Sequence, residues 1–84
     1  MRVRVRLFAS LREAIGEAEV ELELPEGATA EEAWARLARE HPALAERRAR
    51  LTAAINRRYA PFTTMLRDGD ELVFVPPVSG GSGR

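Results

Sequence analysis

Apolar and charged residues alternate strictly in two short segments near the start of the chain. From Arg2 to Leu7 every second residue is valine or leucine and the others are arginines, and from Glu19 to Leu24 the same alternation has glutamates as its polar members. A period of two predicts half-buried strands. In an antiparallel pair the arginine row would lie beside the glutamate row, which helps to fix the register. Between the two strands, Ser10 to Ile15 predicts a helical turn that ends at Gly16.

The middle of the chain has the spacing of one amphipathic helix. Thr29 and Glu32 form a capping-box pattern at its start, and the pair His41-Pro42 is expected to end it. The apolar positions in between recur every three or four residues and form a stripe for packing on the sheet: Ala30, Ala33, Trp34, Leu37 and Ala38. We therefore expect Trp34 to be a core residue and not a binding aromatic.

The second half of the chain has weaker periodicity. A further turn is expected from Ala43 to Arg50, a strand around Leu51 to Ile55, irregular chain from Tyr59 to Leu66, and a turn over residues 67–70. Leu72 to Val75 is wholly apolar, which predicts a strand in the middle of the sheet with both faces covered. The expected order of strand, strand, helix, strand, strand predicts an α+β fold, a mixed sheet packed on one main helix.

The last residues are unlike the rest of the chain. Pro76-Pro77 ends the last strand, because proline has no ladder donor and a fixed φ, and residues 78–81 (VSGG) follow. At roughly 3.3 to 3.6 Å per residue these four residues reach about 13 Å, and a glycine pair passes through a channel too narrow for a Cβ. We expect a domain over residues 1–77 and a flexible C-terminal tail over 78–84 that enters a partner's active site. Glycine- and serine-rich ends are also often merely disordered, which accounts for Ser82 to Arg84 but poorly for the PPVSGG block.

Composition narrows the range of functions. The 84 residues carry 13 basic and 13 acidic side chains, so no overall charge favours nucleic acid or an anionic membrane. Cysteine is absent, which excludes disulfides, thiolate nucleophiles and cysteine-ligated metals. Every basic residue is arginine, so no side-chain amine is available as an isopeptide acceptor. The start of the chain lacks the apolar stretch of a secretory signal, and no run approaches the roughly 20 residues that span a bilayer. We expect a cytoplasmic protein that binds neither nucleic acid nor a membrane.

Candidate catalytic and metal-binding side chains are few. His41 is the only histidine, and Asp68 and Asp70 are expected to form a turn and not to hold a metal. The serines have no evident general base, so the chain is not expected to catalyse a reaction alone. Five arginines cluster in the sequence and form either a solvated surface or a patch for RNA or an acidic partner: Arg47, Arg48, Arg50, Arg57 and Arg58.

Three segments together resemble one family. They are residues 7–13 (LFASLRE), 54–56 (AIN) and 68–81 (DGDELVFVPPVSGG). Over nearly the whole chain up to Gly81, the sequence resembles the small subunit of molybdopterin synthase, the MoaD-like sulfur carriers. The closing block is the specific part, because a Gly-Gly pair alone is a weak signal. The resemblance implies a ubiquitin-like β-grasp fold.

The resemblance also implies a mechanism and a set of site residues. An adenylating enzyme of the ubiquitin-activating type uses ATP to adenylate the Gly81 carboxylate, and sulfur then replaces AMP to give a thiocarboxylate. The tail next enters the large subunit of the synthase and delivers sulfur to a pterin precursor, so the chain itself binds no cofactor. Phe8, Arg12 and Val75 match family positions at the partner surface. The remaining site residues guide the tail, with Gly80 giving steric passage: Pro76, Pro77, Val78, Ser79 and Gly80.

The chain departs from the family pattern at its end. Members of the family end at the double glycine, whereas Ser82, Gly83 and Arg84 follow it here. With these residues attached, Gly81 has no free carboxylate, so adenylation requires a C-terminal processing protease. The alternatives are a precursor, a paralogue or an altered carrier. Two further functions stay open: a sulfur carrier for another pathway such as tRNA thiolation, and a noncatalytic ubiquitin-like interaction module or protein modifier.

Overall fold

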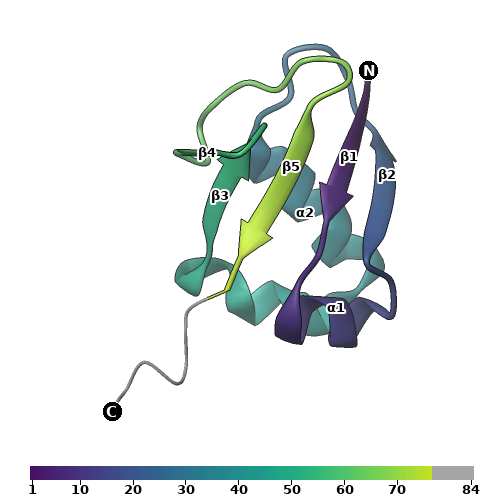
Figure 1. Cartoon of the computed structure of the whole chain (residues 1–84). Coiled ribbons are helices and arrows are strands. Elements are labelled where there is room, and N and C mark those ends of the chain that lie inside the picture. Colours follow the sequence, from purple (N-terminus) through teal and green to yellow (C-terminus); the bar gives the residue numbers. More distant parts are fainter. Residues whose placement is uncertain (77–84) are drawn as a thin grey trace.

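A computed structural model describes residues 1–76 of the chain (Figure 1). Pro77 and the predicted tail over 78–84 lie outside the described residues. Within residues 1–76 the elements are, in order, β1 (Arg2–Arg6), α1 (Ala9–Ile15), β2 (Glu19–Glu23), α2 (Ala30–Glu40), a 3-10 helix η1 (Pro42–Arg50), β3 (Thr52–Ile55), β4 (Arg58–Ala60) and β5 (Glu71–Val75). None of these helices has the length and apolar character needed to cross a membrane.

The strands form one mixed sheet in the order β2-β1-β5-β3-β4. β1 pairs antiparallel with β2 and parallel with β5, and β3 pairs antiparallel with both β5 and β4. The central position predicted for the apolar strand is therefore confirmed. This central position matters for function because the tail follows β5. The strand that precedes the tail is thus hydrogen-bonded on both sides.

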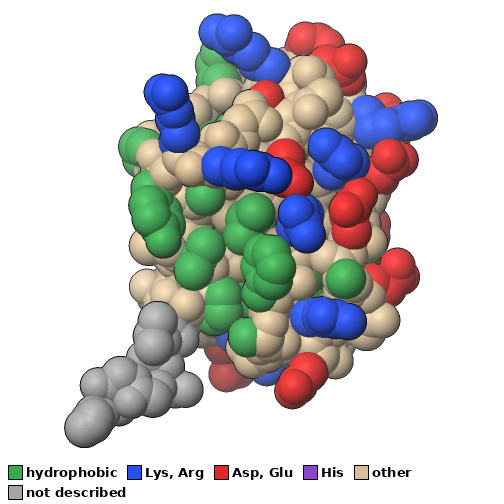
Figure 2. All heavy atoms as spheres, viewed as in Figure 1, with side chains coloured by type: hydrophobic (Ala, Val, Ile, Leu, Met, Phe, Trp, Pro, Cys, Tyr) green, Lys and Arg blue, Asp and Glu red, His purple; other side chains and the backbone are tan. Residues whose placement is uncertain are grey.

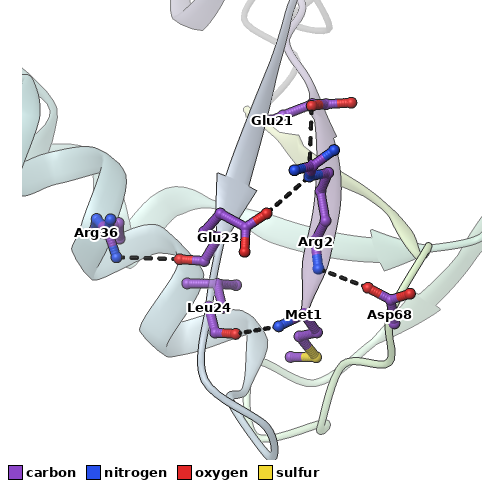
Figure 3. Close-up of polar contacts among 7 residues, drawn as sticks. All are labelled: Met1, Arg2, Glu21, Glu23, Leu24, Arg36 and Asp68. Carbon is purple, nitrogen blue, oxygen red and sulfur yellow. Dashed lines mark hydrogen bonds and ion pairs between the residues drawn. The ribbon is translucent and has the colours of Figure 1, made fainter.

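Opposite charges line the β1–β2 pair, as the alternation predicted. Arg2 lies opposite Glu23 and Arg4 opposite Glu21 in the ladder. The Arg2 Nε atom lies 2.8 Å from a Glu23 carboxylate oxygen and 3.9 Å from one of Glu21 (Figure 3). At the same end of the sheet, the Met1 amino group donates to the Leu24 carbonyl oxygen at 2.7 Å. These contacts help to fix the register of β1 on β2, and β5 pairs with the other edge of β1.

The helix α2 covers one face of the sheet (Figure 1). Its capping box is present, because the Thr29 hydroxyl accepts from the Glu32 amide and the Glu32 carboxylate accepts from the Thr29 amide. The helix ends at His41, whose amide donates to the Leu37 carbonyl oxygen. Trp34 is 3% exposed, which confirms its expected place in the core. The same core contains the inward side chains of the central strands β1 and β5: Val3, Val5, Leu72 and Phe74.

A short stack of side chains joins η1 to this core. Phe62 stacks on Phe74 with ring centroids 5.8 Å apart, and the Arg48 guanidinium carbon lies 3.4 Å from the Phe62 ring centroid. The Arg48 Nε atom donates to both carboxylate oxygens of Glu31, at 3.0 and 2.9 Å. Arg48 thus binds η1 to α2 through an ion pair and a cation–π contact.

Two expectations for the second half of the chain are wrong. The stretch Tyr59 to Leu66, expected to be irregular, begins inside the strand β4, which has only three residues and depends on pairing with β3. The expectation that both faces of the last strand are covered also fails. Leu72 and Phe74 are fully buried, whereas Val73 and Val75 are half-buried, because the helices cover only one face of the sheet.

Candidate functional site

The strand β5 fixes the point at which the tail leaves the body. Its last ladder pair joins Val75 to Thr52 of β3, and the half-buried Pro76 follows directly. Phe74, with no exposed surface, anchors the end of the strand in the core. Proline has no amide donor, so it stops the ladder at this point. Pro76 is therefore the described root of the tail, while the other predicted tail residues lie outside the described part of the chain: Pro77, Val78, Ser79, Gly80 and Gly81.

The open face of the sheet carries an apolar patch beside this root. Ala54 of β3 pairs with Val73 of β5 and with Tyr59 of β4, so these three side chains share the face opposite the core. We define the apolar patch as five side chains at this face: Phe8, Ala54, Tyr59, Val73 and Val75. Phe8 is 46% exposed and Tyr59 77% exposed. Figure 2 shows hydrophobic side chains gathered on this face above the start of the tail.

The other half of the open face is charged. The outward residues of β1 and β2 are the arginine and glutamate rows, which Figure 2 shows beside the apolar patch. Arg6 lies on the boundary: its guanidinium group is 3.5 Å from the Glu71 carboxylate, and its Cζ atom is 5.6 Å from the Phe8 ring centroid. An apolar centre with a charged border is the composition of many protein–protein interfaces.

The structure brings the predicted partner residues to one end of this face. Arg6 lies opposite Val73 at the end of the parallel β1–β5 ladder, and Phe8 and Val75 each follow two residues later. Arg12 is exposed on α1, and its amide donates to the Phe8 carbonyl oxygen at 3.3 Å, one helical turn away. Their role in binding a partner stays a prediction.

Sequence reasoning missed three members of the apolar patch. From the sequence, Val73 is expected on a covered face and Tyr59 in irregular chain, and Ala54 is expected in a strand without being assigned to an exposed face. The alternation of Val73 and Val75 with buried Leu72 and Phe74 was a usable signal for the first. No local signal identified Tyr59, because β4 is too short to have a recognisable period.

The two aspartates before β5 form a turn, as predicted. Asp68 accepts a hydrogen bond from the Arg2 amide, and Asp70 accepts one from the Arg67 amide, both at 2.7 Å. Asp70 also accepts from the Asn56 side-chain amide at 2.8 Å, which ties the β3–β4 turn to the start of β5. Within residues 1–76, no three histidine, cysteine, aspartate or glutamate side chains are grouped so that they could hold a metal ion.

Comparison with known proteins agrees with this arrangement. The sequence profile of the ThiS family matches residues 5–81. The molybdopterin synthase sulfur carrier subunit of Arabidopsis thaliana is 33% identical, over 96% of this chain and 84% of the relative.

Among solved structures, SAMP1 from Haloferax volcanii superposes with a TM-score of 0.87 at 31% identity, over 96% of this chain and all of that one. Subunit 1 in the protein–protein complex of subunits 1 and 2 of molybdopterin-converting factor from Helicobacter pylori has a TM-score of 0.67 at 29% identity, over 96% of this chain and all of that one. The expected ubiquitin-like β-grasp fold is thereby confirmed. Sequence and fold lead to one assignment: the chain belongs to the ThiS family.

Proposed function

We propose that the chain is the sulfur-carrier subunit of a molybdopterin synthase. The observation that carries the proposal is the similarity to three relatives named molybdopterin synthase sulfur carrier subunit, which are 33%, 37% and 35% identical over 96% of this chain. The ThiS profile extends through Gly81, so the similarity includes the double glycine as well as the folded body. The root of the tail on a central strand supports the same function.

The reactive group in this proposal is the α-carboxylate of Gly81. Removal of Ser82 to Arg84 frees this carboxylate, and a partner enzyme adenylates it with ATP and releases pyrophosphate. Sulfide then attacks the acyl carbon and displaces AMP, which leaves a thiocarboxylate. Adenylation is needed because a free carboxylate is a poor acyl donor. The chain contributes a slim carrier and a rigid root, much as group-carrier cofactors do.

We propose that the apolar patch binds the proteins into which the tail is inserted. The neighbour from Helicobacter pylori is described as a complex of subunits 1 and 2, which supports the large subunit as one partner. Phe8 and Val75 would be buried in the centre of that interface, with Arg12 at its border. The adenylating enzyme would use the same surface at a different time, because both proteins must receive the same tail. Since activation consumes ATP, we place the carrier in the cytoplasm.

Versions of the chain with different ends test this proposal. Chains ending at Arg84, Gly81 and Gly80 are incubated with the purified adenylating enzyme, ATP and a sulfur donor, and intact mass is measured. The Gly81 version is expected to exchange one oxygen for sulfur, and the Arg84 version to do so only after a cell extract removes three residues. The Gly80 version is the matched control, with a free carboxylate one residue short. Thiocarboxylation of an untrimmed chain would contradict the proposal.

A second function, protein modification, is favoured by one specific observation. SAMP1, with its TM-score of 0.87, is described in a related structure as a small archaeal modifier protein. As a modifier, the chain would be joined through Gly81 to lysines of other proteins. Because the chain has no lysine, each target site would carry one copy unless the α-amine accepted a second. Isopeptide remnants on cellular proteins, found by mass spectrometry, would identify this function.

A further inference from the structure

A groove opens beside the root of the tail. It has a volume of about 520 Å³ and lies between the start of α1, the end of η1 and the end of β5, which Figure 1 shows at the same end of the molecule. We define the tail-root groove by its lining: Ser10, Leu11, Glu46, Arg47, Arg50, Leu51 and Pro76. We propose that this groove takes a carboxylate side chain of the large subunit that receives the tail. The proposal rests on the proposed function.

The two arginines of the groove are available for an external anion. Within residues 1–76, Arg50 forms no ion pair or side-chain hydrogen bond, and Arg47 donates only to the Ser10 carbonyl oxygen, at 3.4 Å. Arg48, between them in sequence, is occupied by Glu31 and Phe62. Two guanidinium groups on one groove favour a carboxylate, because their planar donor sets match its two oxygens.

The length of the tail limits how far from the groove a partner can lie. Residues 77–81 span at most about 18 Å when fully extended. A protein that holds Gly81 in its active site must therefore come within that distance of Pro76, which is itself part of the groove. The groove thus lies within reach of any protein that binds the end of the tail.

The composition of the groove strengthens an ionic contact once it is covered. Leu11 and Leu51 are buried residues that supply apolar walls, and exclusion of water at such a surface strengthens charge-assisted hydrogen bonds. Glu46 shares the lining and opposes an incoming carboxylate. The groove therefore predicts effects of opposite sign: removing an arginine charge weakens binding, and removing the Glu46 charge tightens it.

Titration of chains that end at Gly81 with the purified large subunit, at several salt concentrations, tests this inference. We expect the double variant Arg47→Gln/Arg50→Gln to raise the dissociation constant about tenfold and to reduce its salt dependence. Glu46→Gln is expected to lower the dissociation constant roughly twofold to threefold. The double variant Arg57→Gln/Arg58→Gln loses the same charge at the opposite end of β3 and is the matched control, expected to bind like the wild type.

The outcomes separate the two proposals. If the chain ending at Gly81, with no other change, does not bind the large subunit, the proposed function fails and this inference with it. If the wild type binds and the Arg47/Arg50 variant equals the Arg57/Arg58 control, only the inference is wrong. Arg50→Gln alone removes no side-chain hydrogen bond or ion pair within residues 1–76, so it guards against a folding defect in the double variant. A reduced affinity of this single variant, with an unchanged melting temperature, would support the groove.

Discussion

Trp34 of α2 and Phe74 of β5 meet edge to face, with ring centroids 5.1 Å apart and ring planes inclined at 76°. Phe62 stacks on the same Phe74 ring. The main helix and a loop therefore both hold the strand that ends at the tail. Because Val73 and Val75 flank Phe74 on the opposite face, one strand provides core packing on one side and the apolar patch on the other.

Replacing Phe74 with leucine tests the inner side of this strand. The change removes two aromatic pairs, each worth about 0.5 to 1.5 kcal/mol beyond burial, so we expect a loss of about 1 to 3 kcal/mol in the free energy of unfolding. Urea unfolding followed by circular dichroism measures it. Val73→Thr keeps a β-branched shape on the open face and is the control; an equal loss for both variants would contradict the division of β5 into two functional faces.

The apolar patch predicts a separation of binding from stability. Phe8→Ala and Val75→Thr are each expected to weaken binding of the large subunit about fivefold to thirtyfold, as for anchors near the centre of an interface. Their melting temperatures should stay close to that of the wild type. Met65, 64% exposed and bridged to Thr29 just before α2, supplies the control Met65→Ala. Unchanged affinity in both patch variants would exclude this face as the docking surface.

The Glu31–Arg48 pair predicts a dependence of stability on pH. The hydrogen bond from Arg48 lowers the pKa of the Glu31 carboxyl below its ordinary value. Because the folded-state pKa is the lower one, the stabilisation is full above the unfolded-state pKa and is lost as pH falls through the folded-state pKa. Both side chains are partly solvated, so we expect at most about 1 kcal/mol. Glu31→Gln should therefore be less stable than the wild type at neutral pH, and the difference should shrink in acid.

Urea unfolding of both proteins across this pH range measures the effect. Glu13→Gln is the control, because Glu13 forms no ion pair within residues 1–76. A difference between Glu31→Gln and the wild type that grew on acidification would show that the sign is wrong.

The turn between β3 and β4 predicts a stabilising substitution. Ile55 and Arg58 close a two-residue turn in which both Asn56 and Arg57 have positive φ, 51° and 72°. Turns of this kind favour Asn-Gly, because glycine adopts positive φ without strain. Arg57→Gly is expected to raise the free energy of unfolding by about 0.5 to 1 kcal/mol, the left-handed penalty less the entropy cost of glycine. The reverse change, Gly69→Ala at φ 87°, should lower it.

Much of the fold could be predicted because its signals are local. The alternation in residues 2–7 and 19–24 set the β1–β2 register, and Thr29 with Glu32 marked the start of α2. The strand β4 could not be predicted, because three residues paired with β3 have no period of their own. The open face of β5 could not be predicted for another reason. An apolar residue has the same place in the sequence pattern whether its face is covered by the protein's own helices or is left open.

The candidate site was predicted in part. Phe8, Arg12 and Val75 came from the family resemblance, and the structure places them at one end of the sheet. The arginine cluster was treated as one feature, yet the fold divides it: Arg48 is a packing residue, Arg47 and Arg50 line the tail-root groove, and Arg57 lies in the turn at the far end of β3. The sequence alone could not reveal this division, because it does not show that β3 carries the chain from the groove to the opposite end of the sheet.

The pairing of β5 with β1 on one side and β3 on the other has a mechanical consequence. A partner that tugs the inserted end outward along the direction of β5 must shear both ladders together and cannot unzip them one bond at a time. Pulling on the tail would therefore load the hydrogen bonds of both ladders at the same time. For the proposed carrier, this double pairing predicts that the body stays folded when a partner releases the tail.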